Sequence, residues 1–394
     1  MKYYINFLRD KPIIRSLSLV NFIASFGAWF STVAIYTMVV EFGSSEFAIA
    51  IVTAMHFIPA ILIAPFSGSL IDRLRIKPLM VTLLFIELSM TACFLLIETA
   101  SDLWLLLIFI FIRMSAASMF FSSEMSLLAK IATGKDLQTA NEIQSIIWSF
   151  TYAVGMAVSG FIVNLYGVKA AILIDVAIFV LAFFVFLNIK INIEYKKVEE
   201  KILELMIDGL RYIKNNKIIL HLIFLHASVG LTSYDALITI LAKNEYKEII
   251  AVPLAIGLSN AVRAVALMIG PLFLNKIIKK ENLQYLLIFQ GITIIIWAFA
   301  QSNFYLSLGA LFFVGFSTAF LWSYTYALLQ NHCDKRYIGR VISYNDMFFM
   351  LANVLTTLFI GTMAHITTTS IITICLGVAF LFYAYYYTKI YSKI

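Results

Sequence analysis

The sequence predicts an all-α integral membrane protein with twelve transmembrane helices in two six-helix halves, and three observations support this. Of the 394 residues, 62% are apolar and 13% are charged, and this charged share is about half that of an ordinary soluble domain. Long apolar runs recur along the whole chain. Lysine and arginine gather in alternate loops between these runs. This composition excludes a soluble enzyme, a secreted disulfide-bonded domain and a disordered chain.

Each apolar run is long enough to cross a bilayer, which takes about 20 residues in a helix. Backbone polar groups in lipid must be satisfied within the segment, so each run is expected to be a helix. A membrane β-barrel would show short alternating strands, whereas these runs are unbroken. The expected spans are residues 14–40, 47–71, 78–97, 103–125, 138–165, 170–189, 218–242, 250–275, 283–300, 304–329, 341–363 and 368–388.

The long connection between the sixth and seventh spans divides the chain. Residues 1–189 are expected to form an N-terminal half and residues 218–394 a C-terminal half. Within the linker, residues 190–217, apolar side chains recur at helical spacing among many charges. This pattern indicates an amphipathic helix on the cytoplasmic face, the plainer alternative being a solvated linker helix. Two halves of like orientation fit a parallel repeat, the plan of one large transporter class.

The distribution of basic residues predicts the orientation. Of 29 Lys and Arg, only Lys169, Lys243 and Lys247 fall in loops on the side opposite the N-terminus, while Arg113 and Arg263 lie within spans. Because basic loops stay in the cytoplasm, both termini are expected there. The basic N-terminus precedes an apolar run longer than a signal peptide's, so we expect a multi-pass protein of a bacterial-type inner (cytoplasmic) membrane.

Other partners and cofactors are not expected. The net charge of +7 is spread over short loops and forms no basic face for nucleic acid. Cys93, Cys333 and Cys375 are far apart, and no CxxC, HExxH or nucleotide-binding motif occurs. We therefore expect no metal site and no cofactor. The expected partners are the lipid bilayer, a small-molecule substrate and protons, and the expected state is a monomer.

A motif after the second span resembles a known signature. Residues 68–77 resemble the loop 2–3 motif of the major facilitator superfamily, G-x-x-x-D-R-x-G-R-K. The matching positions are Gly68, Asp72, Arg73 and Lys77. Arg75 and Ile76 stand where the family has Gly and Arg. The resemblance implies the fold of that family, with this loop joining cytoplasmic helix ends and setting the balance between inward- and outward-facing states.

Two further patterns agree with this family. Arg113 resembles the Arg of the family's R-x-x-x-G motif, with Ala117 in place of Gly. Gly155 and Gly160 resemble part of the antiporter signature G-P-x-x-G-G, which is associated with exporters; the Pro and one Gly are missing. Longer stretches resemble an exporter branch that includes enterobactin exporters and macrolide efflux proteins. The resemblance implies secondary transport of the drug–proton antiporter type.

Ionisable side chains inside a membrane are costly and are expected to face the interior of the bundle. The candidate residues for a substrate and proton cavity are Asp235, Arg113, Arg263, Thr232, Ser228, Tyr36, Glu87 and Asp346. In the seventh span Ser228, Thr232 and Asp235 fall on one helical stripe. Asp235 is the first choice for a carboxylate at which substrate and proton compete. The alternatives are a fixed ion pair with Arg263 on the next helix and a solvated position near the outer mouth.

The other embedded charges have plainer interpretations beside the functional ones. Arg113 is expected either to hold an anionic substrate group or to pair with Glu87 or another acid. Asp175 is interpreted as polar helix packing. Asp346, near the inner end of its span, is interpreted as a gate or helix-end contact. Glu124 is placed near the cytoplasmic end, where a charge costs less.

The sequence thus predicts a proton-coupled exporter of an amphipathic small molecule, either drug-like or a siderophore, that works by alternating access. Lipid, lysolipid or metal transport on the same fold remains an alternative. A polytopic membrane enzyme is a remote alternative, because it would need paired His and Asp near a membrane surface, and the sequence shows none.

Overall fold

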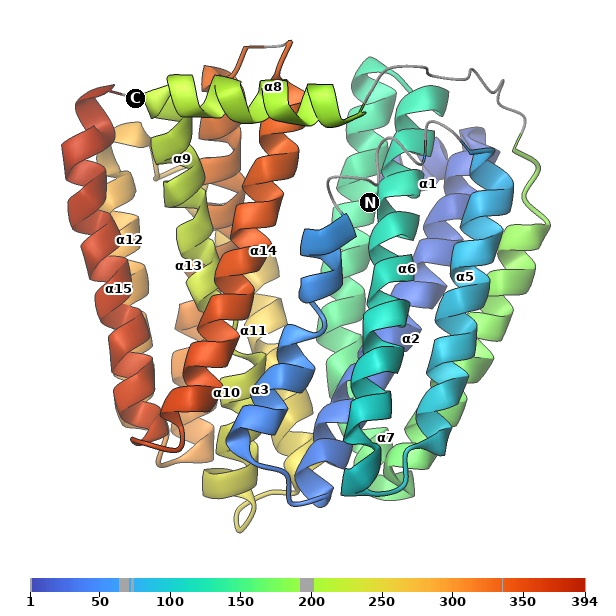
Figure 1. Ribbon diagram of the computed structural model, residues 1–394, viewed down its shortest axis with the longest axis vertical. Coiled ribbons are helices and arrows are strands. Elements are labelled where there is room, and N and C mark those ends of the chain that lie inside the picture. Colours follow the sequence, from blue (N-terminus) through green and yellow to red (C-terminus); the bar gives the residue numbers. More distant parts are fainter. Residues whose placement is uncertain (1, 64–70, 72–73, 192–201, 335, 394) are drawn as a thin grey trace.

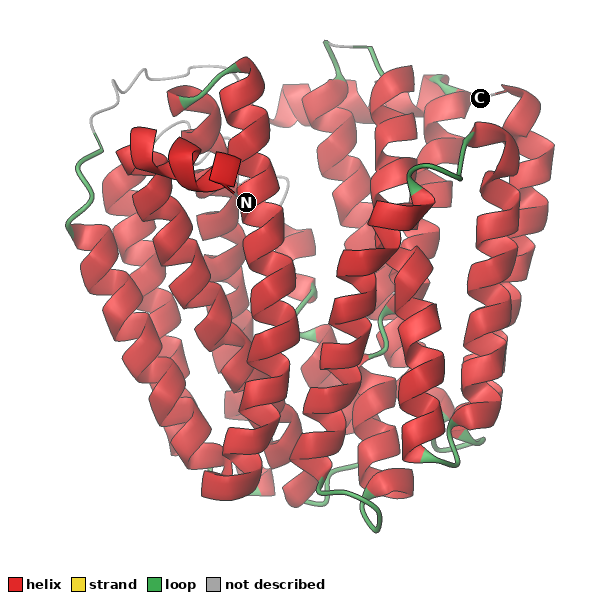
Figure 2. Cartoon of the chain, turned by 180° about the vertical axis from the view of Figure 1, so that it is seen from behind, coloured by secondary structure: helices red, strands yellow, loops and turns green. Residues whose placement is uncertain are grey.

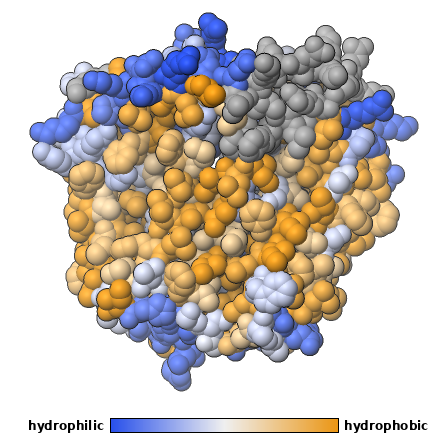
Figure 3. Space-filling model, viewed as in Figure 1, coloured by the Kyte–Doolittle hydropathy of each residue, from blue (hydrophilic) through white to orange (hydrophobic). Residues whose placement is uncertain are grey.

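The computed structural model describes residues 2–63, 71, 74–191, 202–334 and 336–393, and within these ranges every regular element is helical (Figures 1 and 2). Eleven of the described helices are long and apolar enough to cross a membrane. An apolar belt covers the middle of the visible face, and hydrophilic residues gather toward its two ends (Figure 3). This distribution is the one expected when lipid surrounds the middle of the protein.

The helices fall into two bundles joined by a surface helix. The N-terminal half contains α1 Lys2–Asp10, α2 Pro12–Glu41, α3 Glu46–Ala54, α5 Ile76–Cys93, α6 Leu103–Ile131 and α7 Gly134–Leu187. The joining helix is α8, Ile202–Asn215. The C-terminal half contains α9 Lys217–Ala227, α10 Asp235–Leu241, α11 Val252–Leu274, α12 Leu283–Ala300, α13 Phe304–His332, α14 Ile338–Met363 and α15 Thr369–Ile390.

The predicted fifth and sixth spans form one long element, α7, of 54 residues. Its backbone leaves the helical region at Gly167, where φ is 82° and ψ is 171°. A positive φ favours glycine, which has no Cβ to clash. The chain therefore turns at Gly167, and the two parts of α7 correspond to the two predicted spans. Because α7 contains two of the predicted spans, the eleven long helices correspond to twelve membrane crossings.

The predicted seventh span is not one continuous helix, so the stripe of Ser228, Thr232 and Asp235 expected from helical spacing is wrong. A 3₁₀ helix covers Ser228–Thr232 after α9, and α10 begins anew at Asp235. Gly230 lies so close to α14 that a Cβ would come within 2.9 Å of the Phe349 carbonyl oxygen. This close approach accompanies the break, which changes the direction in which Asp235 points.

The two halves touch at one end of the molecule. The α8 helix crosses the opposite end, and both chain termini lie toward the α8 end (Figure 1). One apolar core runs through both halves, from α2 and α3 to α14 and α15. A second core, including Phe7, Met80 and Phe186, contains residues of the N-terminal half only. The halves therefore share packing at the end away from α8.

Small residues allow this close contact between halves. A Cβ on Gly160 of α7 would lie 2.7 Å from the Pro253 carbonyl oxygen, and one on Gly257 of α11 would lie 2.6 Å from the Met156 carbonyl oxygen. A Cβ on Gly361 of α14 would overlap the Cβ of Ala50 on α3. The backbones of α7 and α11, and those of α3 and α14, consequently pack directly against each other. These two contacts close the end of the molecule away from α8, which we call the sealed end.

Candidate functional site

A charged pair lies where the two helices after α9 meet. Asp235 opens α10, and Arg263 lies in the middle of α11. Arg263 Nη2 is 4.0 Å from Asp235 Oδ2, and the two side chains are 14% and 15% exposed. This distance allows Coulomb attraction but exceeds hydrogen-bond length. Arg263 Nη1 is buried and has no hydrogen-bond partner among the described residues, so the guanidinium keeps unused donor capacity.

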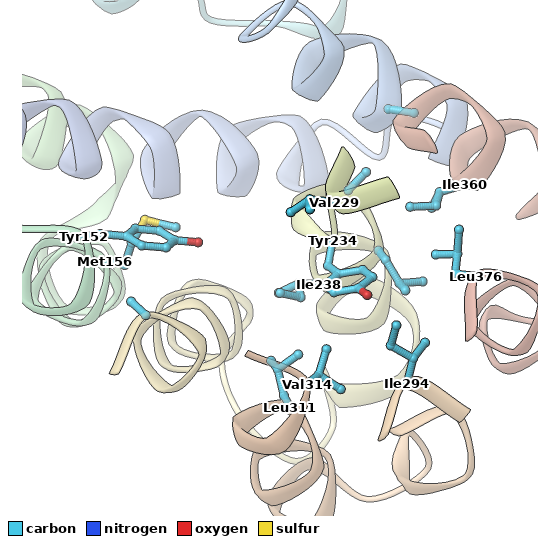
Figure 4. Packing of buried hydrophobic residues seen from close by; sticks show 14 of the residues in the cluster. Tyr152, Met156, Val229, Tyr234, Ile238, Ile294, Leu311, Val314, Ile360 and Leu376 are labelled. Carbon is cyan, nitrogen blue, oxygen red and sulfur yellow. The ribbon is translucent and has the colours of Figure 1, made fainter. Parts of the chain in front are cut away.

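Aromatic rings surround the guanidinium group of Arg263. Its Cζ lies 5.8 Å from the ring centre of Tyr152 and 5.8 Å from that of Tyr234, which are cation–π distances. The Tyr152 side chain points from α7 toward the C-terminal half (Figure 4). Its hydroxyl donates to Asn260 Oδ1 on α11 at 3.1 Å. Residues from both halves therefore form the site.

Two further aromatic contacts extend this site along α2. The ring of Trp29 packs on Tyr152 with centroids 4.4 Å apart. Tyr36, which is 3% exposed, packs against the His56 ring with centroids 5.7 Å apart. Tyr36 belongs to the same apolar core as Tyr152 and Tyr234, the two rings that flank Arg263.

Arg113 belongs to a separate cluster inside the N-terminal half. Its Nη2 lies 3.1 Å from Asp175 Oδ2, and both side chains are buried. The Ser31 hydroxyl also donates to Asp175, and Glu87 on α5 is buried as well. The expectation that Arg113 pairs with an acid agrees with this geometry, and the hydrogen-bonded acid is Asp175. Asp175 is thus an ion-pair member, more than polar packing.

Glu124 lies near the end of α6, as expected, but it is buried, so the expectation that its charge costs little there is wrong. It is 2% exposed, because α6 continues seven residues beyond it to Ile131 and is covered there by α2 and α7. Asn21 Nδ2 donates to its Oε2 at 3.0 Å, and Gln144 Nε2 donates to its Oε1 at 2.8 Å. Its partners are neutral amides.

The remaining predicted residues form hydrogen bonds to neighbouring backbone or side-chain groups and not to the charged pair. Ser228 donates to the Leu225 carbonyl at 2.6 Å and Thr232 to the Val229 carbonyl at 2.7 Å. Asp346 on α14 is half-buried, with Asn345 Nδ2 at 3.4 Å from its Oδ1. Lys77 on α5 donates to the carbonyl of Leu187, the last residue of α7, at 3.1 Å.

The other motif residues divide between the sealed end and the undescribed loop. A Cβ on Gly155 would meet Trp29 of α2 at 2.9 Å, and Gly160 contacts α11 as described above. The predicted loop residues Gly68, Asp72 and Arg73 lie outside the described residues. Of the four motif positions, Lys77 is therefore the one that lies within the described residues.

Two residues of the site were not singled out from the sequence. Asn260 lies three residues before Arg263 and so on the same face of α11; a polar residue at that spacing in an apolar span is a usable signal. Tyr234 reaches the guanidinium because the seventh span breaks just before α10, and the apolar pattern does not reveal that break.

Two membrane-spanning helical bundles that meet around a partly exposed charged pair are the architecture of a secondary active membrane transporter. The sequence model of the Major Facilitator Superfamily matches residues 17–357, and the chain belongs to this family. Members of the family transport solutes and are not enzymes. No curated protein sequence matches the chain closely enough to count as a relative.

Solved structures share the fold at low sequence identity. The nucleoside transporter NupG has a TM-score of 0.76 at 13% identity, covering 96% of this chain and 99% of that one. A mutant of the peptide transporter POT, in complex with alafosfalin, gives 0.74 at 11%, covering 96% and 94%. The D-xylose–proton symporter gives 0.72 at 14%, covering 94% and 97%. At these identities the likeness establishes the fold, and substrate and direction remain to be argued.

Proposed function

We propose that this transporter exports an amphipathic small molecule, drug-like or a siderophore, across a bacterial inner membrane in exchange for protons. The observation that carries the proposal is the loose Asp235–Arg263 pair, 4.0 Å apart and enclosed by aromatic rings where the halves meet. Aromatic faces suit the apolar part of such a molecule, and the charged groups suit its polar part.

Asp235 is the proposed coupling residue. An ion pair beyond hydrogen-bond length is easier to open than a hydrogen-bonded one. The ionised Asp235 carboxylate can bind a cationic or hydrogen-bond-donating group of the substrate, and protonation of Asp235 removes the negative charge that holds this group. Substrate and proton then compete through a single pair, which is the minimum that an exchanger needs.

Alternating access follows from where the halves touch. With both termini in the cytoplasm, the sealed end is the outer one, and the structure faces inward. Opening the outer end requires separating α7 from α11 and α3 from α14. The comparable transporter structures include a bacterial homologue of the human lysosomal transporter Spinster in an inward-facing, unoccupied conformation, with a TM-score of 0.71 at 13% identity.

The direction of export is supported by Gly155 and Gly160. These residues resemble part of the signature associated with exporters, and both permit close contacts of α7, with α2 and α11 respectively. A tight outer seal prevents protons from leaking inward while the substrate site faces the cytoplasm. The resemblance to the enterobactin exporter and macrolide efflux branch points the same way.

Lipid and metal cargoes are the competing proposals. Within the described residues no group of three or more His, Cys, Asp or Glu could hold a metal ion, which favours an organic cargo. A lipid cargo would show headgroup-dependent movement between leaflets in vesicles and no effect on soluble dyes.

Dye accumulation tests the proposal. The protein is expressed in cells lacking their main efflux pumps, and accumulation of ethidium and rhodamine 6G is followed with and without a protonophore. We expect expression to lower accumulation, and both the protonophore and Asp235→Asn to restore it. Glu98→Gln, which alters an exposed acid in the N-terminal half, is expected to export as the parent does. No change with any dye would refute broad drug export, and export by Asp235→Asn at the parent rate would remove Asp235 from coupling.

A further inference from the structure

The buried carboxyl of Glu124 on α6 has no role in the site around Asp235. We propose that Glu124 binds a second proton during the transport cycle, on the N-terminal side of the transport path. This inference rests on the proposed proton coupling. It assigns one carboxyl group in each half a part in that coupling.

The surroundings of Glu124 are neutral. It is 2% exposed, and its two oxygens accept hydrogen bonds from Asn21 of α2 and Gln144 of α7. In the described part of the chain no cation contacts it. The cations on the neighbouring helices pair elsewhere or are exposed: Arg113 pairs with Asp175, Lys11 pairs with Asp136, Lys77 donates to the Leu187 carbonyl, and Arg15, Lys130 and Lys135 are exposed. Of the acids there, Glu142 accepts from Tyr4, and Glu87 is buried.

A carboxyl group in this setting has a reason to take up a proton. Burial penalises its charged form, and no cation offsets that penalty. Two amide donors stabilise the charged form in turn. The protonated and ionised forms are thereby brought closer in free energy than they would be beside a cation, as Asp175 is beside Arg113.

The amide partners suit both protonation states. An amide carries a donor and an acceptor, and turning it by 180° exchanges them. With Glu124 ionised, both amides donate to it, as observed. Gln144 Oε1 now accepts from Asn21 Nδ2. With Glu124 protonated, its hydroxyl needs an acceptor, and Gln144 offers its Oε1 when both amides turn together, so that Gln144 Nε2 donates to Asn21 Oδ1. A glutamine at position 124 has nearly the same size but an amide donor in place of one acceptor oxygen, so one partner amide would have to turn to accept from it.

One face of α2 connects Glu124 with the charged pair. Asn21, Ser25 and Trp29 follow one another at four-residue spacing, and the Ser25 hydroxyl donates to Asn21 Oδ1 at 2.7 Å. Trp29 packs on Tyr152, whose hydroxyl donates to Asn260 beside Arg263. A change at Asn21 when Glu124 binds its proton therefore bears on a helix that also contacts the charged site.

A spectroscopic experiment reads the protonation of Glu124 without any substrate. The full chain in lipid nanodiscs is examined by infrared spectroscopy from about pH 5 to about pH 9, which covers documented values for buried Glu. We expect the carbonyl band of a protonated carboxyl that fades as the pH rises, is lost in Glu124→Gln and persists in Glu142→Gln. If Glu124→Gln removes no such band, the inference is wrong. If that variant does not fold, Glu124→Asp serves instead and is expected to shift the band.

Transport in inverted vesicles tests the role in coupling. We expect Glu124→Gln to exchange ethidium without a gradient as the parent does, but to lose the acceleration that a proton gradient gives. A variant that lacks the infrared band yet keeps full acceleration would overturn the coupling role. If the parent protein moves no dye, the proposed function fails, and the infrared band alone then decides whether Glu124 takes up a proton.

Discussion

Three acids within the membrane-spanning helices differ in how their charge is compensated. Asp175 has a hydrogen-bonded guanidinium at 3.1 Å, Asp235 has one at 4.0 Å, and Glu124 has two amides. A close buried pair is expensive to break, because the remaining charge is left in a medium of low polarity. This ordering favours a structural role for Asp175, and it is the reason why we propose proton binding at the other two acids.

The Arg113–Asp175 pair is expected to matter for stability. Arg113→Met leaves Asp175 and Glu87 buried without their cation, and removing one partner of a buried pair costs about 3–5 kcal/mol. The free energy of unfolding, measured by denaturation of the purified protein in detergent, should fall by that amount. Lys169→Met breaks the exposed pair with Glu98, whose separation is 2.7 Å, and should cost at most about 1 kcal/mol. Equal losses in the two variants would contradict the structural role.

At the scale of helices, the sequence predicted the spans that are uniform and missed the features that depend on neighbours. The ninth expected span, 283–300, has the same bounds as α12, Leu283–Ala300, because an unbroken apolar run between polar loops determines a membrane helix. The break before α10 lies where Gly230 contacts α14. That contact joins residues more than a hundred positions apart, so local patterns did not reveal it.

The contact of α7 with α11 gives a prediction about the closed outer end. In Gly160→Ala the new methyl would meet the Pro253 carbonyl oxygen, a backbone atom that no rotamer change can move away. Overpacking of this kind costs about 1–3 kcal/mol, so the sealed state should be less populated. The readout is labelling of Ala50→Cys, buried in the parent, by an impermeant maleimide in a background whose native cysteines are replaced by serine.

The matched control for this prediction is Gly309→Ala on α13. A Cβ there has nothing within 4 Å, and replacing glycine in a helix with alanine favours the helix by up to about 1 kcal/mol. Labelling of Ala50→Cys should stay at the parent level in this variant. Unchanged labelling in Gly160→Ala would mean that the α7–α11 contact does not hold the outer end closed.

A charged latch reinforces the same end. Lys243 Nζ lies 3.1 Å from Glu46 Oε1 and donates to the Ser44 carbonyl at 2.7 Å, while His365 Nδ1 lies 3.5 Å from Glu46 Oε2. Glu46 belongs to the N-terminal half, and Lys243 and His365 belong to the C-terminal half. The latch therefore has to open each time the outer end opens.

Removing the latch should shift the balance between states. Glu46→Gln loses the ion pair, which is worth about 1 kcal/mol at such partly exposed positions, and a difference of that size changes a population ratio about fivefold. Labelling of Ala50→Cys should rise accordingly. Glu98→Gln removes an acid that pairs within its own half and should leave the labelling unchanged. Equal labelling in both variants would show that the latch does not hold the sealed state.

At the scale of the whole molecule, composition determined the class, and geometry was needed for the site. The sequence placed Asp235 and Arg263 on consecutive spans and left open whether they pair. In the structure the charged atoms of Asp235 and Arg263 are 4.0 Å apart, so a fixed ion pair remains an alternative to the coupling role. The structure also adds Tyr152, from the N-terminal half, to the site. How two halves meet depends on side chains far apart in the chain, so periodicity within one helix could not give it.

Orientation is the property on which export, inward opening and the outer latch all depend. Basic residues avoid the loops at the sealed end except for Lys169, Lys243 and Lys247, so that end should lie outside. Alkaline phosphatase, which is active only outside the cytoplasm, should be active when fused after Asn303 between α12 and α13 and inactive after Ile394; a fluorescent protein should show the opposite pattern. If the phosphatase is active at Ile394 instead, the structure faces outward, and the direction of every proposed step reverses.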